Sequence, residues 1–182
     1  MKWNEHKRVG DHALLAPSAH YWINYDRDKL SEYISSVQAK DMGTRLHALA
    51  AELISLRRRQ RNTKDTLDMY VNDAIGFDMD VEILLYYSDY IFGHADAIAF
   101  DGKKLRIHDL KTGKLPASMD QLRIYAALFC LEYGQDPESI EIELRIYQLN
   151  DKKIEKADPM LIRTYMNRII DADKLVMEKL GE

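Results

Sequence analysis

A short stretch, residues 93–114, constrains this chain most, because it places two carboxylates and a lysine in an otherwise apolar β pattern. Residues 95–100 and 103–110 are rich in β-branched and apolar side chains, as strands are. Between them lies Asp101-Gly102, a dipeptide typical of tight hairpin turns. We therefore predict an antiparallel pair of strands joined by a two-residue turn at Asp101-Gly102.

This turn would fix which side chains face one another across the hairpin. It places Phe100 opposite Lys103 and Asp96 opposite Ile107, with Asp109 one diagonal step beyond Asp96 and opposite His94. Diagonal neighbours lie about 7–8 Å apart, so the two carboxylates could converge on one hard cation. A three-residue loop would reverse the parity and remove this argument. The face predicted to carry the site holds Asp96, Ile98, Phe100, Leu105, Ile107, Asp109 and Lys111.

Two half-buried carboxylates side by side repel each other, so a cation or a proton must compensate their charge. A second interpretation needs no site. In it, Asp109 caps the end of a strand, Lys111 is its ion-pair partner, and residues 112–114 form a solvated turn. Spacing alone leaves both interpretations open.

The ordered residues resemble a known signature. Gly93-His94-Ala95-Asp96, followed by Asp109-Leu110-Lys111-Thr112-Gly113-Lys114, resembles the motifs of the RecB-like branch of the PD-(D/E)XK nuclease superfamily. That branch adds a helical histidine upstream and a Gln-x-x-x-Tyr helix downstream, matched here by His47 and by Gln121 with Tyr125. The resemblance spans roughly residues 47–125, and residues 12–18 resemble the opening of small stand-alone phage members.

The resemblance implies a restriction-endonuclease-like α/β core, with a central mixed sheet flanked by helices. It also implies Mg²⁺ or Mn²⁺ as cofactor and assigns roles to residues. The metal ligands would be His47, Asp96, Asp109 and the carbonyl of Leu110, and Lys111 would assist attack of water on a phosphodiester. Gln121 and Tyr125 would order that water, the lysine or a phosphate. Glu82 is expected either in the outer shell of the site or facing solvent. His94, opposite Asp109 in the predicted register, is expected either in the outer shell or as a metal ligand.

The function implied is hydrolysis of DNA, with exonuclease action in phage-type recombination, repair or processing expected by analogy. A recombination or annealing protein is then the expected protein partner. Three alternatives stay open: a structure-specific endonuclease of the same fold, a nuclease of RNA, and a non-catalytic module that kept the fold and binds nucleic acid or protein. The sequence does not distinguish single-stranded from double-stranded substrates.

The chain has 182 residues, of which 46% are hydrophobic, and this fits one globular domain. We expect a helical part at residues 1–78 and a sheet-plus-helix core at residues 79–182. No apolar run approaches the roughly 20 residues needed to span a bilayer, so we expect no membrane partner and a cytoplasmic location, in the host cell if a phage encodes the chain. The single cysteine, Cys130, excludes an intrachain disulfide and a zinc or iron–sulfur site built on several thiolates.

A formal net charge of −4 argues slightly against a nucleic-acid partner, because phosphate binding uses clusters of Lys and Arg. One cluster does exist, formed by Arg57, Arg58, Arg59 and Arg61. We expect it at the end of a helix over residues 42–59, where it either contacts the DNA backbone or forms a solvated helix end.

The other elements expected are helices from Ser18 and over residues 28–39, 63–75 and 118–133, and strands over residues 80–87 and 139–149. The last strand alternates apolar and polar residues, which predicts one wet face. A closing helix should begin after Asp158-Pro159. This order of elements predicts an α/β sandwich whose sheet is covered on both faces.

Overall fold

The computed structural model describes residue 15 and residues 17–181, so the motif predicted at residues 12–18 lies largely outside the described chain. The described chain divides into two compact units between Thr44 and Arg45. The first contains a 3₁₀ helix, η1 (Pro17–Asn24), where a short helix was expected, and the beginning of α1 (Arg27–Ser55). The prediction of two helices, at residues 28–39 and 42–59, is wrong, because α1 is continuous across them.

The second unit is built on a five-stranded sheet. Its strands are β1 (Asp80–Ser88), β2 (Ile91–Phe100), β3 (Lys104–Leu110), β4 (Glu141–Gln148) and β5 (Asp151–Lys156), in the spatial order β1-β2-β3-β4-β5. Strands β3 and β4 are parallel and the other neighbours are antiparallel. The predicted α/β class with a mixed sheet is therefore confirmed.

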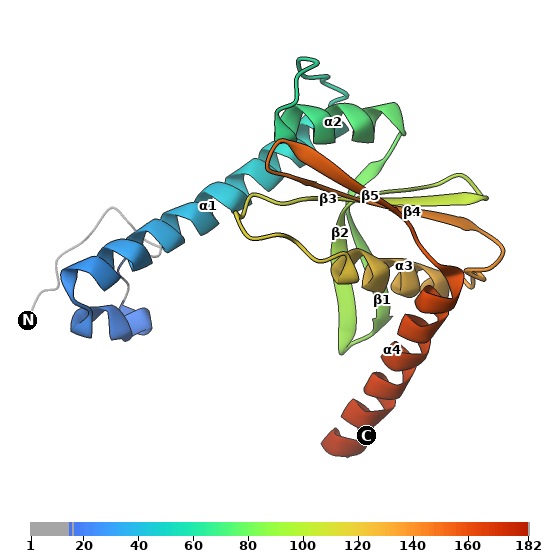
Figure 1. The fold of residues 1–182 in the computed structure, drawn as a ribbon. Helices are drawn as coiled ribbons and strands as arrows, with labels where there is room; N and C mark the ends of the chain where they lie inside the picture. The colour runs from blue at the N-terminus through green and yellow to red at the C-terminus, as the bar shows by residue number, and fades with distance from the viewer. Residues whose placement is uncertain (1–14, 16, 182) are drawn as a thin grey trace, which may run out of the picture. The chain divides into compact units, whose positions relative to one another are not determined.

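Helices cover both faces of this sheet, as Figure 1 shows for α2 and α3. On one face, α3 (Asp120–Glu132) and α4 (Pro159–Leu180) pack over a core that includes Ile98, Ile107 and Leu144. On the other face, α2 (Thr66–Gly76) and the last turns of α1 enclose a smaller core around Ala97 and Tyr147. The two cores hold the sheet between two helical layers, which is the predicted sandwich.

The hairpin between β2 and β3 forms, but its predicted register is wrong by two residues. Phe100 lies opposite Leu105, and the turn residues are Gly102 and Lys103. The cause is Asp101, whose Oδ1 accepts hydrogen bonds from the backbone N–H groups of Lys103 and Lys104 at 3.0 and 2.7 Å. Asp101 is thus the first residue of the turn and Gly102, at φ 89°, is a central one.

A shift of two residues preserves side-chain parity, so Ile98 and Ile107 still face the larger core, as predicted. Its main effect is on the acidic pair. Ala97 lies opposite His108, and continuing that register by one residue puts Asp96 opposite Asp109, instead of on the diagonal. His94 moves away from Asp109 and lies opposite Leu84 of β1.

In strands β1 and β2, the alternation of side chains between the two faces of the sheet is interrupted near Asp96. Val81 and Ala97 belong to the core under α2, whereas Ile83 and Ala95, two residues along each strand, belong to the core under α3. Regular alternation would put 81 with 83 and 95 with 97, so the pleat is interrupted between them. Glu82 has a positive φ of 54°, which marks a local irregularity of the backbone at this point.

Strand β4 does not have the expected wet face, because α2 covers much of it. Tyr147 is fully buried there, and its hydroxyl donates a 2.7 Å hydrogen bond to Asp73 of α2. The same carboxylate oxygen accepts from Arg145 at 3.1 Å and from Lys152 at 2.9 Å. Burial acts to raise the pKa of Asp73, but these three donors outweigh it and hold the pKa below its usual range. Asp73 therefore joins α2 to β4 and β5 by charge.

Replacing this carboxylate tests that link. We expect Asp73→Asn to lower the free energy of unfolding by about 1–3 kcal/mol near neutral pH, because Lys152 loses its carboxylate partner and Arg145 keeps only Glu143. Since the pKa of Asp73 is lowered on folding, its charge stabilises the fold above the usual carboxyl pKa, and this contribution is lost as pH falls through the folded value. Urea unfolding of Asp73→Asn, with the exposed Asp171→Asn as control, checks both points. Equal losses in the two variants would contradict the link.

Among the described residues, no helix has the length and apolar character needed to cross a bilayer. Cys130 is buried in α3 as a free thiol, and burial raises its pKa to about 11. A thiol held in this protonated form is not a reactive nucleophile.

Candidate active site at the end of strand β3

The motif residues come from three layers of the second unit. Asp96 lies on β2, Asp109 lies at the end of β3 and Lys111 follows directly after that strand. His47 is contributed by α1 on one side of the sheet, and Gln121 by α3 on the other. The structure thus brings together residues that are up to 74 positions apart in the sequence, from 47 to 121.

On the α1 side, Asp96 is held by two nitrogen atoms. Its Oδ2 lies 3.3 Å from His47 Nδ1 and accepts a 3.1 Å hydrogen bond from the backbone N–H of Leu110. The contact with Asp96 raises the pKa of His47, while partial burial acts in the opposite direction. The negative charge of Asp96 therefore favours a protonated imidazole here.

On the α3 side, the centre of the arrangement is Lys111. Its Nζ lies 3.0 Å from Asp109 Oδ1 and donates a 2.7 Å hydrogen bond to Gln121 Oε1. Gln121 Nε2 in turn donates to the Tyr125 hydroxyl at 3.4 Å. The lysine is thus fixed between a carboxylate and an amide, and the amide is fixed by a tyrosine one helical turn further on.

Gly93 makes the last of these contacts feasible. A Cβ atom at this position would lie 3.0 Å from a ring carbon of Tyr125 and 3.4 Å from its hydroxyl oxygen. Any other residue at 93 would therefore press on the tyrosine that holds Gln121. This gives a physical reason for glycine three residues before Asp96 on the same strand.

The two carboxylates of the acidic pair, Asp96 and Asp109, repel each other, and this costs electrostatic free energy. Burial raises the pKa of Asp109, and the neighbouring charge of Asp96 raises it further, while Lys111 and His47 act against both. Among the described residues, Asp109 Oδ2 is also one of three buried side-chain atoms without a hydrogen-bond partner. A buried carboxylate oxygen with no donor is a candidate ligand for a cation.

The side chains present fit a divalent ion chemically, though they are not arranged around one. Within the described chain, no group of three or more His, Cys, Asp and Glu side chains is already placed to hold a metal. Asp96 is instead engaged by His47, and Asp109 by Lys111. Two carboxylates and an imidazole are nevertheless donors that Mg²⁺ or Mn²⁺ accepts. Binding would require His47 to lose its proton and turn from donor to ligand.

Glu82 and His94 were both expected near the site, but only Glu82 lies next to the acidic pair. Glu82 is exposed, and the register of β1 and β2 puts it opposite Asp96, at the change of faces described above. His94 is also exposed, and the corrected register takes it away from Asp109. The register thus places Glu82 next to Asp96, which suits an outer-shell role, whereas it takes His94 away from Asp109.

Tyr70 of α2 is a neighbour of the site that sequence reasoning did not single out. It is buried against Tyr147, with ring centroids 5.4 Å apart. Burial raises its pKa well above the usual range, and the charges of Asp96 and Asp109 add to that effect. The Tyr70 phenol therefore stays neutral within electrostatic range of the two carboxylates. In sequence, Tyr70 is indistinguishable from the apolar stripe of its helix.

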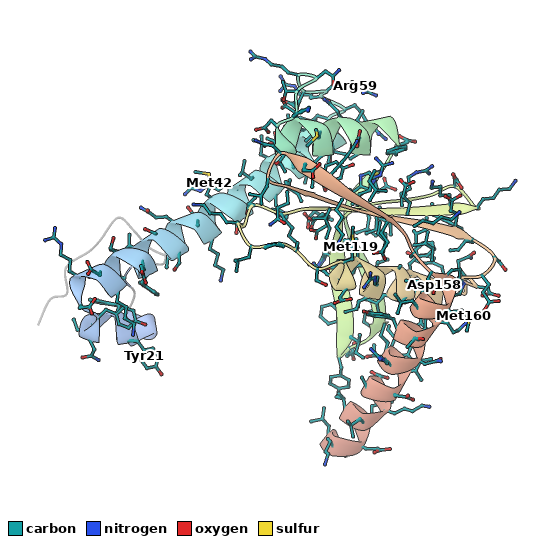
Figure 2. The ribbon with its side chains drawn as sticks, in the orientation of Figure 1. Tyr21, Met42, Arg59, Met119, Asp158 and Met160 are labelled. Carbon is teal, nitrogen blue, oxygen red and sulfur yellow. The ribbon has the colours of Figure 1, made fainter. Side chains whose placement is uncertain are left out.

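The arginine run was expected at the end of a helix, but it lies beyond the last turn of α1. Helix α1 ends at Ser55, and Arg57 has a positive φ of 53°, with the N–H of Arg58 bonded back to the carbonyl of Leu53 at 2.8 Å. These are features of a Schellman helix end. Arg57 pairs with Asp78, and Figure 2 shows Arg59 on the connection between α1 and α2. The residues of this run, Arg57, Arg58, Arg59 and Arg61, are all exposed.

The run therefore remains available for phosphate contacts, and this can be tested. We expect Arg58→Gln, Arg59→Gln and Arg61→Gln together to weaken DNA binding and to reduce the slope of log affinity against log salt by up to about 0.9 per lost phosphate contact. Arg57 is left in place because it holds Asp78. A matched triple change at Lys153, Lys174 and Lys179, which are exposed on β5 and α4, serves as control. An identical slope in the wild type, the arginine variant and the lysine control would mean that the run is a solvated loop without phosphate contacts.

The chain matches no family model, and it has no significant match among the curated proteins. Its function must therefore be argued from the arrangement of its own residues.

Proposed function

We propose that this protein is a metal-dependent nuclease that hydrolyses phosphodiester bonds in DNA. The observation that carries this proposal is the position of Lys111, whose ammonium bridges Asp109 and Gln121 beside a carboxylate oxygen without a donor. A structural ion pair would need neither the buried second oxygen nor the second acidic residue, Asp96. The sequence resemblance to RecB-like nucleases and the sandwiched mixed sheet support the same conclusion, and a restriction-endonuclease-like core is part of the proposal.

Asp96 and Asp109 would hold Mg²⁺ or Mn²⁺, with His47 and the carbonyl of Leu110 completing the protein shell. Such an ion supplies Lewis-acid stabilisation of the charge that develops on the phosphodiester oxygens. His47 supports this use, since its present contact with Asp96 keeps an imidazole within reach of the acidic pair. An imidazole ligand makes Mn²⁺ a credible alternative to Mg²⁺.

Lys111 would act on the reacting groups directly. Its ammonium can orient an attacking water, or stabilise the phosphate as negative charge increases in the transition state. Gln121 is a positioning residue, because it holds Nζ at 2.7 Å and is itself held by Tyr125. With a metal held by Asp109, Lys111 would keep Gln121 as a second anchor and would stay in the site.

Exonuclease action in phage-type recombination or repair is our expectation for the biological role, and a structure-specific endonuclease is the alternative. The two differ in whether cleavage needs a DNA end. A non-catalytic binding module is the rival from another class. It would bind nucleic acid without any response to the metal.

The decisive experiment is incubation of the purified protein with linear and covalently closed circular DNA, single- and double-stranded, and with single-stranded RNA. Each substrate is offered with Mg²⁺, Mn²⁺ or EDTA. We expect metal-dependent cleavage of linear DNA that EDTA abolishes. Cleavage of closed circles would favour an endonuclease, and cleavage of RNA alone would change the substrate class. No cleavage of any substrate would favour the binding module.

A further inference from the structure

A cavity of about 510 Å³ adjoins the candidate site and is lined in part by Leu110 and Lys111. Four separate segments line it: α1, the first turn of α2, the end of β3 with its following loop, and the turn between β4 and β5. Leu110 and Lys111 belong both to this cavity and to the site, since the Leu110 N–H holds Asp96 and the Lys111 ammonium holds Asp109. Anything bound here would therefore touch the segment that carries the chemistry.

The lining combines apolar walls with a polar edge. Leu46, Leu67 and Leu149 contribute apolar surface. Polar and charged groups come from Asp65, Thr66, Lys111 and Asn150. The volume falls within the usual range of small-molecule sites, about 300–1,000 Å³. A flat apolar body with polar groups at its rim fits such a lining, and a nucleobase has this chemistry.

The polar edge has hydrogen-bonding capacity to spare. Asn150 Oδ1 accepts from both the N–H and the hydroxyl of Thr66, each at 3.2 Å, and the Asn150 N–H donates to that hydroxyl at 2.7 Å. These bonds fix the orientation of the amide. Within the described chain they leave its nitrogen, Nδ2, without an acceptor, and every nucleobase offers ring-nitrogen or carbonyl acceptors at its edge.

Leu149 is the most unusual residue of the lining. It has a positive φ of 54°, followed by Asn150 at 58°, so both central residues of the β4–β5 turn are left-handed. Asn and Gly suit such positions, whereas leucine is strained there by roughly 1–2 kcal/mol. Its side chain is also 63% exposed, so the core gains little from it. A strained, exposed leucine at the edge of a cavity is consistent with a contact made to a ligand.

We propose that this cavity binds the base of a nucleotide next to the phosphodiester that is cleaved, with Leu149 packing on the base and Asn150 contacting its edge. Because it rests on the proposed nuclease function, this assignment places the substrate strand across the Lys111 segment. It requires an unpaired base, since a base stacked within a duplex cannot enter a cavity.

The test uses the whole protein in EDTA, so that no cleavage occurs, and follows backbone amides by NMR during titration with deoxyadenosine monophosphate. We expect shifts at Thr66, Leu67, Gly113 and Asn150. Deoxyribose 5-phosphate, which lacks the base, should not reproduce them. Equal shifts with the two probes, or shifts confined to other parts of the chain, would overturn the assignment.

Two variants sharpen the test. Leu149→Asn should weaken deoxyadenosine monophosphate binding roughly tenfold without lowering the melting temperature, because asparagine tolerates the left-handed backbone. Leu115→Asn, at a leucine that is 84% exposed and outside the lining, should leave binding unchanged. Gly113→Leu adds a side chain where a Cβ meets open space at the cavity wall, and should weaken binding through an independent position. Unchanged affinity in both Leu149→Asn and Gly113→Leu would overturn the proposal.

The outcomes also separate this inference from the proposed function. Metal-dependent cleavage by a protein without base-dependent shifts would reject the cavity and keep the nuclease. Base-dependent shifts in a protein that cleaves nothing would reject the nuclease and keep a nucleotide-binding cavity.

Discussion

Asp109→Asn is expected to abolish two responses at once: the rise in melting temperature on adding Mg²⁺ or Mn²⁺, and the cleavage of DNA. In the wild-type protein a metal at a hundredfold excess over its Kd stabilises the fold by about 2.7 kcal/mol. For a chain of this size that corresponds to a shift of roughly 5–10 °C. The buried carboxylate provides the main charge for binding, so its neutral counterpart should show no shift.

The isosteric change keeps the shape of the site, and this makes the result interpretable. A neutral amide in place of the Asp109 carboxylate would no longer repel Asp96, so the variant should fold in EDTA even though Lys111 loses an ion-pair partner. Melting curves over a metal titration are compared with those of Asp80→Asn, an exposed carboxylate at the start of β1. A metal-dependent shift that survives in Asp109→Asn would place the ion elsewhere or remove it from the mechanism.

In the β2–β3 hairpin, local sequence patterns predicted the turn and the buried face, but not the pairing register. The Asp-Gly dipeptide correctly located the turn between β2 and β3, and the apolar alternation correctly chose the face of Ile98 and Ile107. The pairing depended on the Asp101 carboxylate, which caps two backbone N–H groups and shifts the turn by one residue. Such a cap favours a two-residue turn at Gly102-Lys103 over one at Asp101-Gly102, and pattern alone does not decide between the two positions.

Strand β5 was missed because its sequence, Asp-Lys-Lys-Ile-Glu-Lys, lacks apolar alternation. It is an edge strand, and charged lysine-rich edges are how proteins discourage pairing with other sheets. The covered face of β4 was missed for a related reason. Its polar residues meet α2 through the partly buried Asp73–Tyr147 hydrogen bond, which links positions 74 residues apart and has no local sequence signal.

The candidate site also combines features that the sequence predicts with features that depend on tertiary packing. Residue identities and their order predicted that His47, Asp96, Asp109, Lys111 and Gln121 belong together. The fold brings them into two neighbouring contact groups, one of His47 with Asp96 and one of Asp109 with Lys111 and Gln121. The change of faces at Glu82, the proximity of Tyr70 and the cavity beside Lys111 depend on how helices pack over the sheet. Tertiary packing of this kind has no periodic signal in the chain.

Lys111→Met is the change that separates an enzyme from a binding module. Methionine keeps much of the apolar stem while it removes the ammonium, so the fold should persist. Cleavage of linear DNA should fall by roughly 10²–10⁴-fold, the usual loss for a positioned acid–base group. Metal binding should be equal or tighter, because the ammonium that now occupies Asp109 Oδ1 at 3.0 Å is gone.

The rate of cleavage by Lys111→Met at saturating metal distinguishes a catalytic lysine from a structural one. If Lys111 served only to neutralise Asp109, its loss would destabilise the protein in EDTA, and added metal would restore both stability and activity. If it acts on the reacting groups, metal restores stability and leaves cleavage slow. The comparison pairs a metal titration by melting with a single-turnover time course, using Lys114→Met, an exposed lysine of the same loop, as the matched control. Full cleavage by Lys111→Met at saturating metal would remove this lysine from the chemistry and leave catalysis to the metal held by the acidic pair.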